Sequence, residues 1–194
     1  GCAVGCPWCD TRQTWHIDPA NRVDELEQAL GENELWAEAH AAEIAAFVSH
    51  NYPTLLWVLV TGGEPADQEL EELVDALHDA GYNCAIETSG TADGHLLADF
   101  DHVCVSPKLK MPGGKSILPE IVREAQEIKH VVGKQAHVEQ LLALLKACKV
   151  NKHKTTVCLQ PLSQSAKATD LCVAACKQYG WRLSVQLHKY LELP

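Results

Sequence analysis

The chain has 194 residues, a length typical of one domain. Apolar residues make up 46% of it and charged residues 22%, an ordinary globular composition that argues against disordered, collagen-like and coiled-coil proteins. No stretch approaches the ~20 uninterrupted apolar residues of a membrane span, and a formal net charge of −10 disfavours general binding to nucleic acid. We therefore expect a globular protein with neither a membrane nor a nucleic-acid partner.

The start of the chain and its cysteines indicate its setting. Gly1 is the first residue, the single methionine is Met111, and no signal peptide precedes the first cysteine, so we expect that the natural N-terminus is missing. Three of the nine cysteines lie close together at the start, and the others are scattered. An odd number of cysteines in a chain with long apolar segments is not typical of a secreted disulfide scaffold. We expect a reducing, cytoplasmic setting and one metal site near the start.

The first expected elements alternate between helix and strand. Residues 34–50 are rich in alanine and glutamate, and their apolar side chains fit helical spacing. The continuous apolar run 55–60 predicts a short strand that is buried on both faces. A second helix is expected over 67–81, with Asp67 as its N-cap and Gly81 as its C-terminal stop.

The alternation continues to the end of the chain without consecutive hairpins. This order favours right-handed crossover units and a parallel sheet. About six strands are too few for a closed eight-stranded barrel, so the predicted fold is α/β, a partial, open TIM-like βα barrel. The remaining strands are expected over 83–87, 102–106, 127–132, 155–160 and 181–186, and the remaining helices over 117–126, 138–148 and 166–179.

The spacing Cys2-x3-Cys6-x2-Cys9 brings three thiols into one short loop, and thiolates ligate iron or zinc. A structural zinc site and an ordinary iron–sulfur cluster both need a fourth ligand, for which the nearest candidate is His16. Three ligands without a fourth indicate a cluster with one open corner, at which a substrate or cofactor binds. A zinc-binding interaction module is the alternative from a different class.

The loop GCAVGCPWCDT resembles the cluster loop of radical S-adenosylmethionine enzymes, Cys-x3-Cys-x-aromatic-Cys. The resemblance implies that Cys2, Cys6 and Cys9 hold a [4Fe–4S] cluster. The open iron of that cluster is chelated by the amino and carboxylate groups of S-adenosylmethionine. Trp8 stands at the aromatic position, which lies near the adenine.

Polar motifs follow four of the expected strands. TGGEP at 61–65 places two glycines at a strand end, where a ligand can approach the backbone closely. The same residues also suit a plain turn in which Pro65 opens a helix, but after the cysteine loop they resemble the GGE motif that binds the amino group of S-adenosylmethionine. Because parallel α/β folds bind ligands at strand carboxyl ends, we expect one site there. The other motifs are ETSG at 87–90, SPK at 106–108 and QPL at 160–162.

A series of short motifs, taken in order, resembles the 7-carboxy-7-deazaguanine synthase family over the whole chain. The motifs are CDT, TGGEP, IETSGT, VSPK, LQPLSQ and the terminal VQLHKYLELP. The resemblance implies one radical S-adenosylmethionine domain over 1–194, with the cluster loop at 1–11. It implies conversion of 6-carboxy-5,6,7,8-tetrahydropterin to 7-carboxy-7-deazaguanine with loss of ammonia, in queuosine and deazapurine biosynthesis. The family's first strand and upstream segment are absent from this chain, which leaves the expected pterin site incomplete.

The resemblance also implies roles for individual residues. S-adenosylmethionine would contact Trp8, Gly62, Gly63, Glu64, Ser89, Ser106, Lys108 and Gln160. The pterin would contact Thr61, Glu87, His188 and the terminal carboxylate of Pro194, and Leu187 replaces a threonine of the family. Mg²⁺, which favours oxygen donors and keeps several waters, would bind Thr11 with support from Asp10; the alternative for these two is a helix cap. The other histidines, His130 among them, are expected to be ordinary surface or core residues.

Further implications concern partners. The family resemblance implies a homodimer and an electron donor of the flavodoxin or ferredoxin type. A second hypothesis is an activase that makes a glycyl radical on a protein partner, because such enzymes share the cluster loop and the GGE motif. That activity would require a large protein-docking surface.

Overall fold

The computed structural model describes residues 1–31, 34–92 and 95–191. Its centre is a six-stranded parallel sheet in which each strand pairs with the next one along the chain, in the order β1-β2-β3-β4-β5-β6. This order leaves β1 and β6 as edges, so the sheet is open and the predicted α/β architecture is confirmed. The strands are β1 (Trp57–Val60), β2 (Asn83–Thr88), β3 (His102–Val105), β4 (Glu127–Val132), β5 (Thr156–Pro161) and β6 (Arg182–Leu183).

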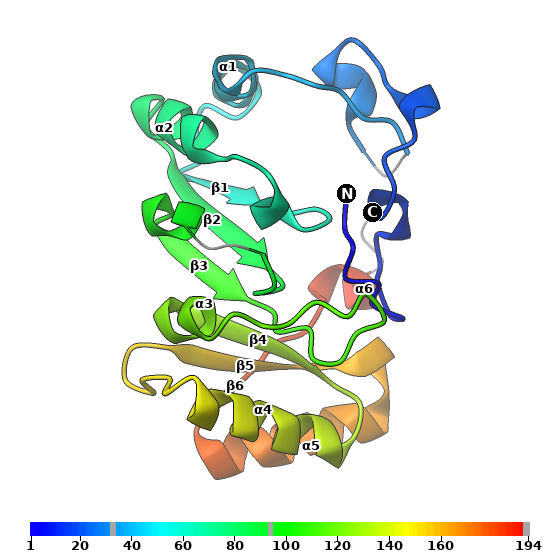
Figure 1. The fold of residues 1–194 in the computed structure, drawn as a ribbon, viewed down its shortest axis with the longest axis vertical. Coiled ribbons are helices and arrows are strands. Elements are labelled where there is room, and N and C mark those ends of the chain that lie inside the picture. The colour runs from blue at the N-terminus through cyan, green and yellow to red at the C-terminus, as the bar shows by residue number, and fades with distance from the viewer. Residues whose placement is uncertain (32–33, 93–94, 192–194) are drawn as a thin grey trace.

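Helices cover the outer side of this curved sheet, while the N-terminal segment and α6 lie on its other side (Figure 1). The apolar core lies between the sheet and the helices, where Leu77, Ile86, Ile128, Leu141 and Leu159 are fully buried. The helices are α1 (Ala41–Asn51), α2 (Glu71–Asp79), α3 (Pro119–Glu124), α4 (Gln135–Ala147), α5 (Ala166–Tyr179) and α6 (Leu187–Leu191). None of the described helices combines the length and the hydropathy needed to cross a bilayer.

The predicted start of the first helix was wrong. Residues 34–40 are not helical, because the backbone of Trp36 bonds to an earlier segment: its N–H donates to Asn21 and its carbonyl accepts from Val23. Helix α1 begins after His40, whose backbone N–H donates to the Glu43 carboxylate at 2.8 Å. A contact with residues far back in the sequence therefore overrides the helical composition of this stretch.

The second helix is also shorter than predicted, and Asp67 is not its N-cap. Residues 65–67 form a separate 3₁₀ turn, capped by Glu64, which accepts from the Ala66 N–H at 3.2 Å. The helix α2 begins only after Leu70. Its stop was predicted correctly: Gly81 takes a φ of +89°, a left-handed conformation that suits glycine at the end of a helix.

The two edge strands depart from expectation as well. The run 55–60 is not buried on both faces, since Leu56 is 68% exposed, Trp57 50% and Leu59 52%. The reason is that β1 pairs on one side only, with β2. At the other edge β6 has two residues in place of the predicted 181–186. Its last backbone bond to β5 is the one that the Ser184 N–H donates to the Leu159 carbonyl, and the chain then runs to the N-terminal loop, where Gln186 bonds to Asp10.

Candidate functional site

A cavity of about 750 Å³ lies at the carboxyl ends of the strands and against the N-terminal loop. It brings together residues from the ends of five strands, as the sheet topology requires for a parallel fold. Glu64 is buried next to the cavity wall. The residues that received roles from the sequence and that line the cavity are Cys2, Cys6, Trp8, Cys9, Asp10, Thr11, Thr61, Gly62, Gly63, Glu87, Ser89, Ser106, Lys108 and Gln160.

The cysteine loop is held by backbone contacts to two glycine-containing turns. The Glu64 N–H donates to the Gly1 carbonyl at 3.1 Å, and the Gly113 N–H donates to the Val4 carbonyl at 3.1 Å. A Cβ atom on Gly63 would lie 2.4 Å from the Gly1 oxygen, so only glycine allows this approach. The TGGEP turn therefore has a packing role: the cysteine loop packs directly against its backbone.

The three thiols of the loop are free and share the cavity, with Cys6 the most buried. Burial raises the pKa of the Cys6 thiol; the Lys108 charge opposes this rise, and the charges of Cys9 and Cys2 add to it. Within residues 1–31, 34–92 and 95–191, no three His, Cys, Asp or Glu side chains are close enough to hold a single metal ion. In a [4Fe–4S] cluster each cysteine binds a separate iron, a wider arrangement that suits three thiols around one cavity.

The Glu64 carboxylate at the site accepts four hydrogen bonds. Its Oε1 accepts from the Thr88 hydroxyl at 2.6 Å and from the Ala66 N–H, and its Oε2 accepts from both the backbone N–H, at 2.8 Å, and the hydroxyl of Ser89. Three of these four donor groups belong to Thr88 and Ser89 at the end of β2, so the network ties the TGGEP turn to the ETSG segment. Sequence reasoning singled out Glu64 but not this saturation of its oxygens.

The C-terminal segment reaches the cysteine loop through Asp10. Gln186 Nε2 donates to Asp10 Oδ2 at 2.8 Å, and Lys189 Nζ donates to Asp10 Oδ1 at 2.7 Å. Thr11 precedes a 3₁₀ turn, but its side chain does not cap that turn, and its hydroxyl lies 3.7 Å from Cys9 Sγ. The plain cap offered as an alternative for these residues is therefore not how Thr11 is used.

Two lysines lie in the cavity, and the sequence singled out only one of them. Lys108 Nζ donates to Ser106 Oγ at 2.6 Å, and its burial lowers the pKa of the ammonium. Lys129, on β4, donates to Glu87 Oε1 of β2. Lys129 carried no motif, and only its inward-facing position on a strand could have indicated it.

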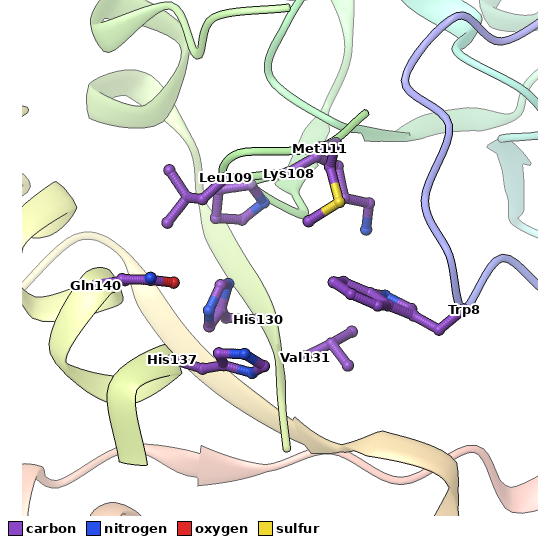
Figure 2. Close-up of a pocket in the computed structure, with 9 residues that line it drawn as sticks. Trp8, Lys108, Leu109, Met111, His130, Val131, His137 and Gln140 are labelled. Carbon is purple, nitrogen blue, oxygen red and sulfur yellow. The ribbon is translucent and has the colours of Figure 1, made fainter. Parts of the chain in front are cut away.

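A small cavity of about 40 Å³ adjoins the main one beside Trp8 (Figure 2). His130 of β4 lies within it, 6% exposed, and neither ring nitrogen has a hydrogen-bond partner among the described residues. Burial, together with the nearby charges of His137 and Lys108, lowers the pKa of His130 to about 4. The expectation of an ordinary core histidine with satisfied nitrogens was wrong for His130, because no described group forms a hydrogen bond of ordinary geometry with its ring.

Two expected pterin contacts fall at the end of the chain. His188 lies on α6, and its side chain is outside the described part of the structure. Pro194 lies outside the described residues altogether. Leu187, which replaces a threonine of the family, is exposed on α6.

No protein-family model matches the chain, but individual known proteins do. The chain is 38% identical over 200 residues to the 7-carboxy-7-deazaguanine synthase of Escherichia coli (strain K12), covering 100% of this chain and 86% of that protein. It is 33% identical over 195 residues to the protein of the same name from Buchnera aphidicola subsp. Schizaphis graminum (strain Sg), again with 100% and 86% coverage.

Solved structures agree with these relatives. The crystal structure of QueE from Escherichia coli matches with a TM-score of 0.87 and 39% identity, over 96% of this chain and 82% of that one. Streptococcus suis SuiB bound to S-adenosylmethionine matches with a TM-score of 0.54 and 11% identity, over 80% of this chain and 45% of that one, and this likeness concerns the fold alone. On the full-length identity to the named relatives, the chain belongs to the 7-carboxy-7-deazaguanine synthase family.

Proposed function

We propose that this chain is a radical S-adenosylmethionine lyase that converts 6-carboxy-5,6,7,8-tetrahydropterin to 7-carboxy-7-deazaguanine with release of ammonia, in queuosine biosynthesis. The observation that carries the proposal is the meeting of three free thiols with the TGGEP, ETSG, SPK and QPL segments around one cavity. The family relatives, 38% identical over the whole chain, support the same reaction. One radical S-adenosylmethionine domain would span residues 1–194.

The cluster and the cofactor have a chemically suitable seat. Cys2, Cys6 and Cys9 are the thiolates that would hold a [4Fe–4S] cluster, and S-adenosylmethionine would lie against the glycine turn and Lys108. When bound, the two supply the radical chemistry that amino-acid side chains cannot supply. The role of the chain itself is to position the reactants. One example is the Glu64 carboxylate of the glycine turn, which hydrogen bonds from Thr88 and Ser89 hold in a fixed position.

The remaining assignments belong to the same proposal. Thr11 Oγ1 would hold Mg²⁺, which favours oxygen donors. Asp10, held by Gln186 and Lys189, would keep the C-terminal segment at the site. The cofactor would contact Trp8, Gly62, Gly63, Glu64, Ser89, Ser106 and Gln160. The pterin would contact Thr61, Glu87, His188 and Pro194. A homodimer and a flavodoxin- or ferredoxin-type electron donor complete the proposal.

The test is a product assay. Protein reconstituted anaerobically with iron and sulfide is incubated with S-adenosylmethionine, Mg²⁺, a reductant and 6-carboxytetrahydropterin, and the products are identified by mass. We expect 7-carboxy-7-deazaguanine from the unchanged chain, none from Cys6→Ala, and the unchanged yield from the control Cys148→Ala, whose buried thiol lies outside the cavity. Cleavage of S-adenosylmethionine without deazaguanine would instead favour the activase, and colourless protein with bound zinc would favour the interaction module.

A further inference from the structure

The pair formed by Lys129 and Glu87 crosses the floor of the cavity. Glu87 on β2 lies opposite Cys104 on β3, and Cys104 lies opposite Glu127 on β4, so the ion pair spans the strand between its members. The side chains of Lys129 and Glu87 are 21% and 32% exposed, and both line the same cavity as the cysteine loop. The pair is therefore accessible to a ligand in that cavity, although it is largely shielded from bulk water.

The Lys129–Glu87 pair joins an ammonium to a carboxylate. Burial by itself would lower the pKa of Lys129, but the hydrogen bond and the charge of Glu87 outweigh burial and raise it. Lys108, the other lysine of the cavity, donates to Ser106 instead. Among the described residues Lys129 donates to Glu87 Oε1 alone, which leaves two of its three N–H donors, together with Glu87 Oε2, available to a ligand.

The geometry points to a recognition role for the pair, and this inference rests on the proposed function. We propose that Lys129 and Glu87 together recognise the 2-amino-4-oxo edge of the pterin, with Lys129 as the residue that selects for the carbonyl oxygen at C4. That edge presents two donors, the 2-amino group and N3–H, followed by one acceptor, O4. The pair presents two carboxylate oxygens followed by an ammonium, with Oε1 next to the ammonium, which is the complementary order.

A selective role differs from a structural role in a measurable way. In 2,4-diaminopteridine-6-carboxylate, an amino group replaces O4 and the N3 hydrogen is lost. The 4-amino group is a donor, so it cannot accept from Lys129, and its N–H groups would point at the N–H groups of the Lys129 ammonium. If Lys129 only held Glu87 in place, its removal would also weaken the diamino analogue, because that ligand keeps the 2-amino group that Glu87 accepts from. If Lys129 bonds to O4, only the 4-oxo ligand loses affinity.

The experiment measures binding of 6-carboxypterin and of its 2,4-diamino analogue to the reconstituted protein by fluorescence titration. We expect the unchanged chain to prefer 6-carboxypterin. In Lys129→Met we expect the affinity for 6-carboxypterin to fall about 10- to 100-fold, the range for a hydrogen bond to a charged donor, with the diamino analogue little changed. The control Lys152→Met removes the same charge from an exposed site outside the cavity and is expected to keep the preference.

A second variant covers the case in which Lys129→Met does not fold. Lys129→Gln keeps a polar group beside Glu87 and offers both a donor and an acceptor, so it is expected to bind both ligands and to narrow the preference. A clear loss of affinity for the diamino analogue as well, or an unchanged preference in the folded variants, would overturn the selective role. If the unchanged chain makes 7-carboxy-7-deazaguanine in that case, the proposed function stands; if it makes none and binds neither pterin, the proposed function itself has failed.

Discussion

His130 illustrates at the scale of one residue how burial controls protonation. Its ring lacks partners among the described residues, and the neighbouring Lys108 and His137 add positive charge beside it. The neutral ring is therefore favoured in the folded chain, with a pKa of about 4 against an ordinary value of 6.5. In the unfolded chain the same ring takes up a proton at higher pH.

This difference predicts an acid sensitivity. Between pH 6.5 and about pH 4 the unfolded chain binds a proton that the folded chain does not, so stability falls as the pH falls through that window. The full loss attributable to His130 is about 3 kcal/mol. We expect His130→Leu to lose less stability than the unchanged chain over the window in urea unfolding, and the exposed-site control His153→Leu to behave like the unchanged chain. Parallel stability curves for the unchanged chain and His130→Leu would contradict the prediction.

At the scale of elements, the turn at 112–114 acts as a support for the cysteine loop. A Cβ atom on Gly113 would lie 1.8 Å from the Ala3 carbonyl oxygen, a distance that the two backbones can relieve only by moving apart. The neighbouring Gly114 has open space around it and a φ of +68°. A substitution at Gly113 therefore tests the steric contact with the cysteine loop, whereas a substitution at Gly114 tests only the backbone strain of the turn.

We expect Gly113→Ala to displace the cysteine loop and to lower the iron bound per chain after reconstitution, with a small change in melting temperature, because the turn lies away from the main core. Gly114→Ala is the matched control: it costs about 1 kcal/mol of backbone strain but leaves the contact to Ala3 intact, so full iron binding is expected. Iron content and cluster absorbance provide the measurement. Normal iron loading in Gly113→Ala would show that the contact does not position the loop.

At the scale of the whole molecule, the open sheet makes stability uneven. Strands β4 and β5 pair over six residues each and have neighbours on both sides, whereas β1 has one neighbour and β6 contributes only two residues. Edge backbone groups are exposed to water, and local opening begins where few buried contacts oppose it.

Hydrogen exchange is expected to follow this order. Amides of 127–132 and 156–161 should exchange last, and those of 57–60 and 182–183 much earlier, as measured by mass spectrometry on proteolytic peptides. The helix α5 packs on β5 and serves as an internal reference for a protected element outside the sheet. Uniform protection across all strands would indicate that the sheet opens only as a whole.

Local patterns in the sequence determined much of this protein. The helix predicted over 166–179 matches α5 at both bounds, and the alternation of strands and helices predicted the open parallel sheet. The cysteine spacing and the ordered strand-end motifs indicated the family. These features depend on residues that are close in sequence, and therefore the amino-acid sequence alone predicts them.

Only the tertiary structure decided the features that depend on distant partners. Pairing of Trp36 with 21–23 moves the start of α1 to residue 41, and the lack of a second neighbour exposes β1. The strand β6 ends where the chain turns towards the contacts of Gln186 and Lys189 with Asp10. The Lys129–Glu87 pair and the unpartnered ring of His130 likewise arise from side chains that strands far apart in sequence bring together. No local pattern records such contacts, because the free energy that selects them comes from burial and electrostatics in the assembled fold.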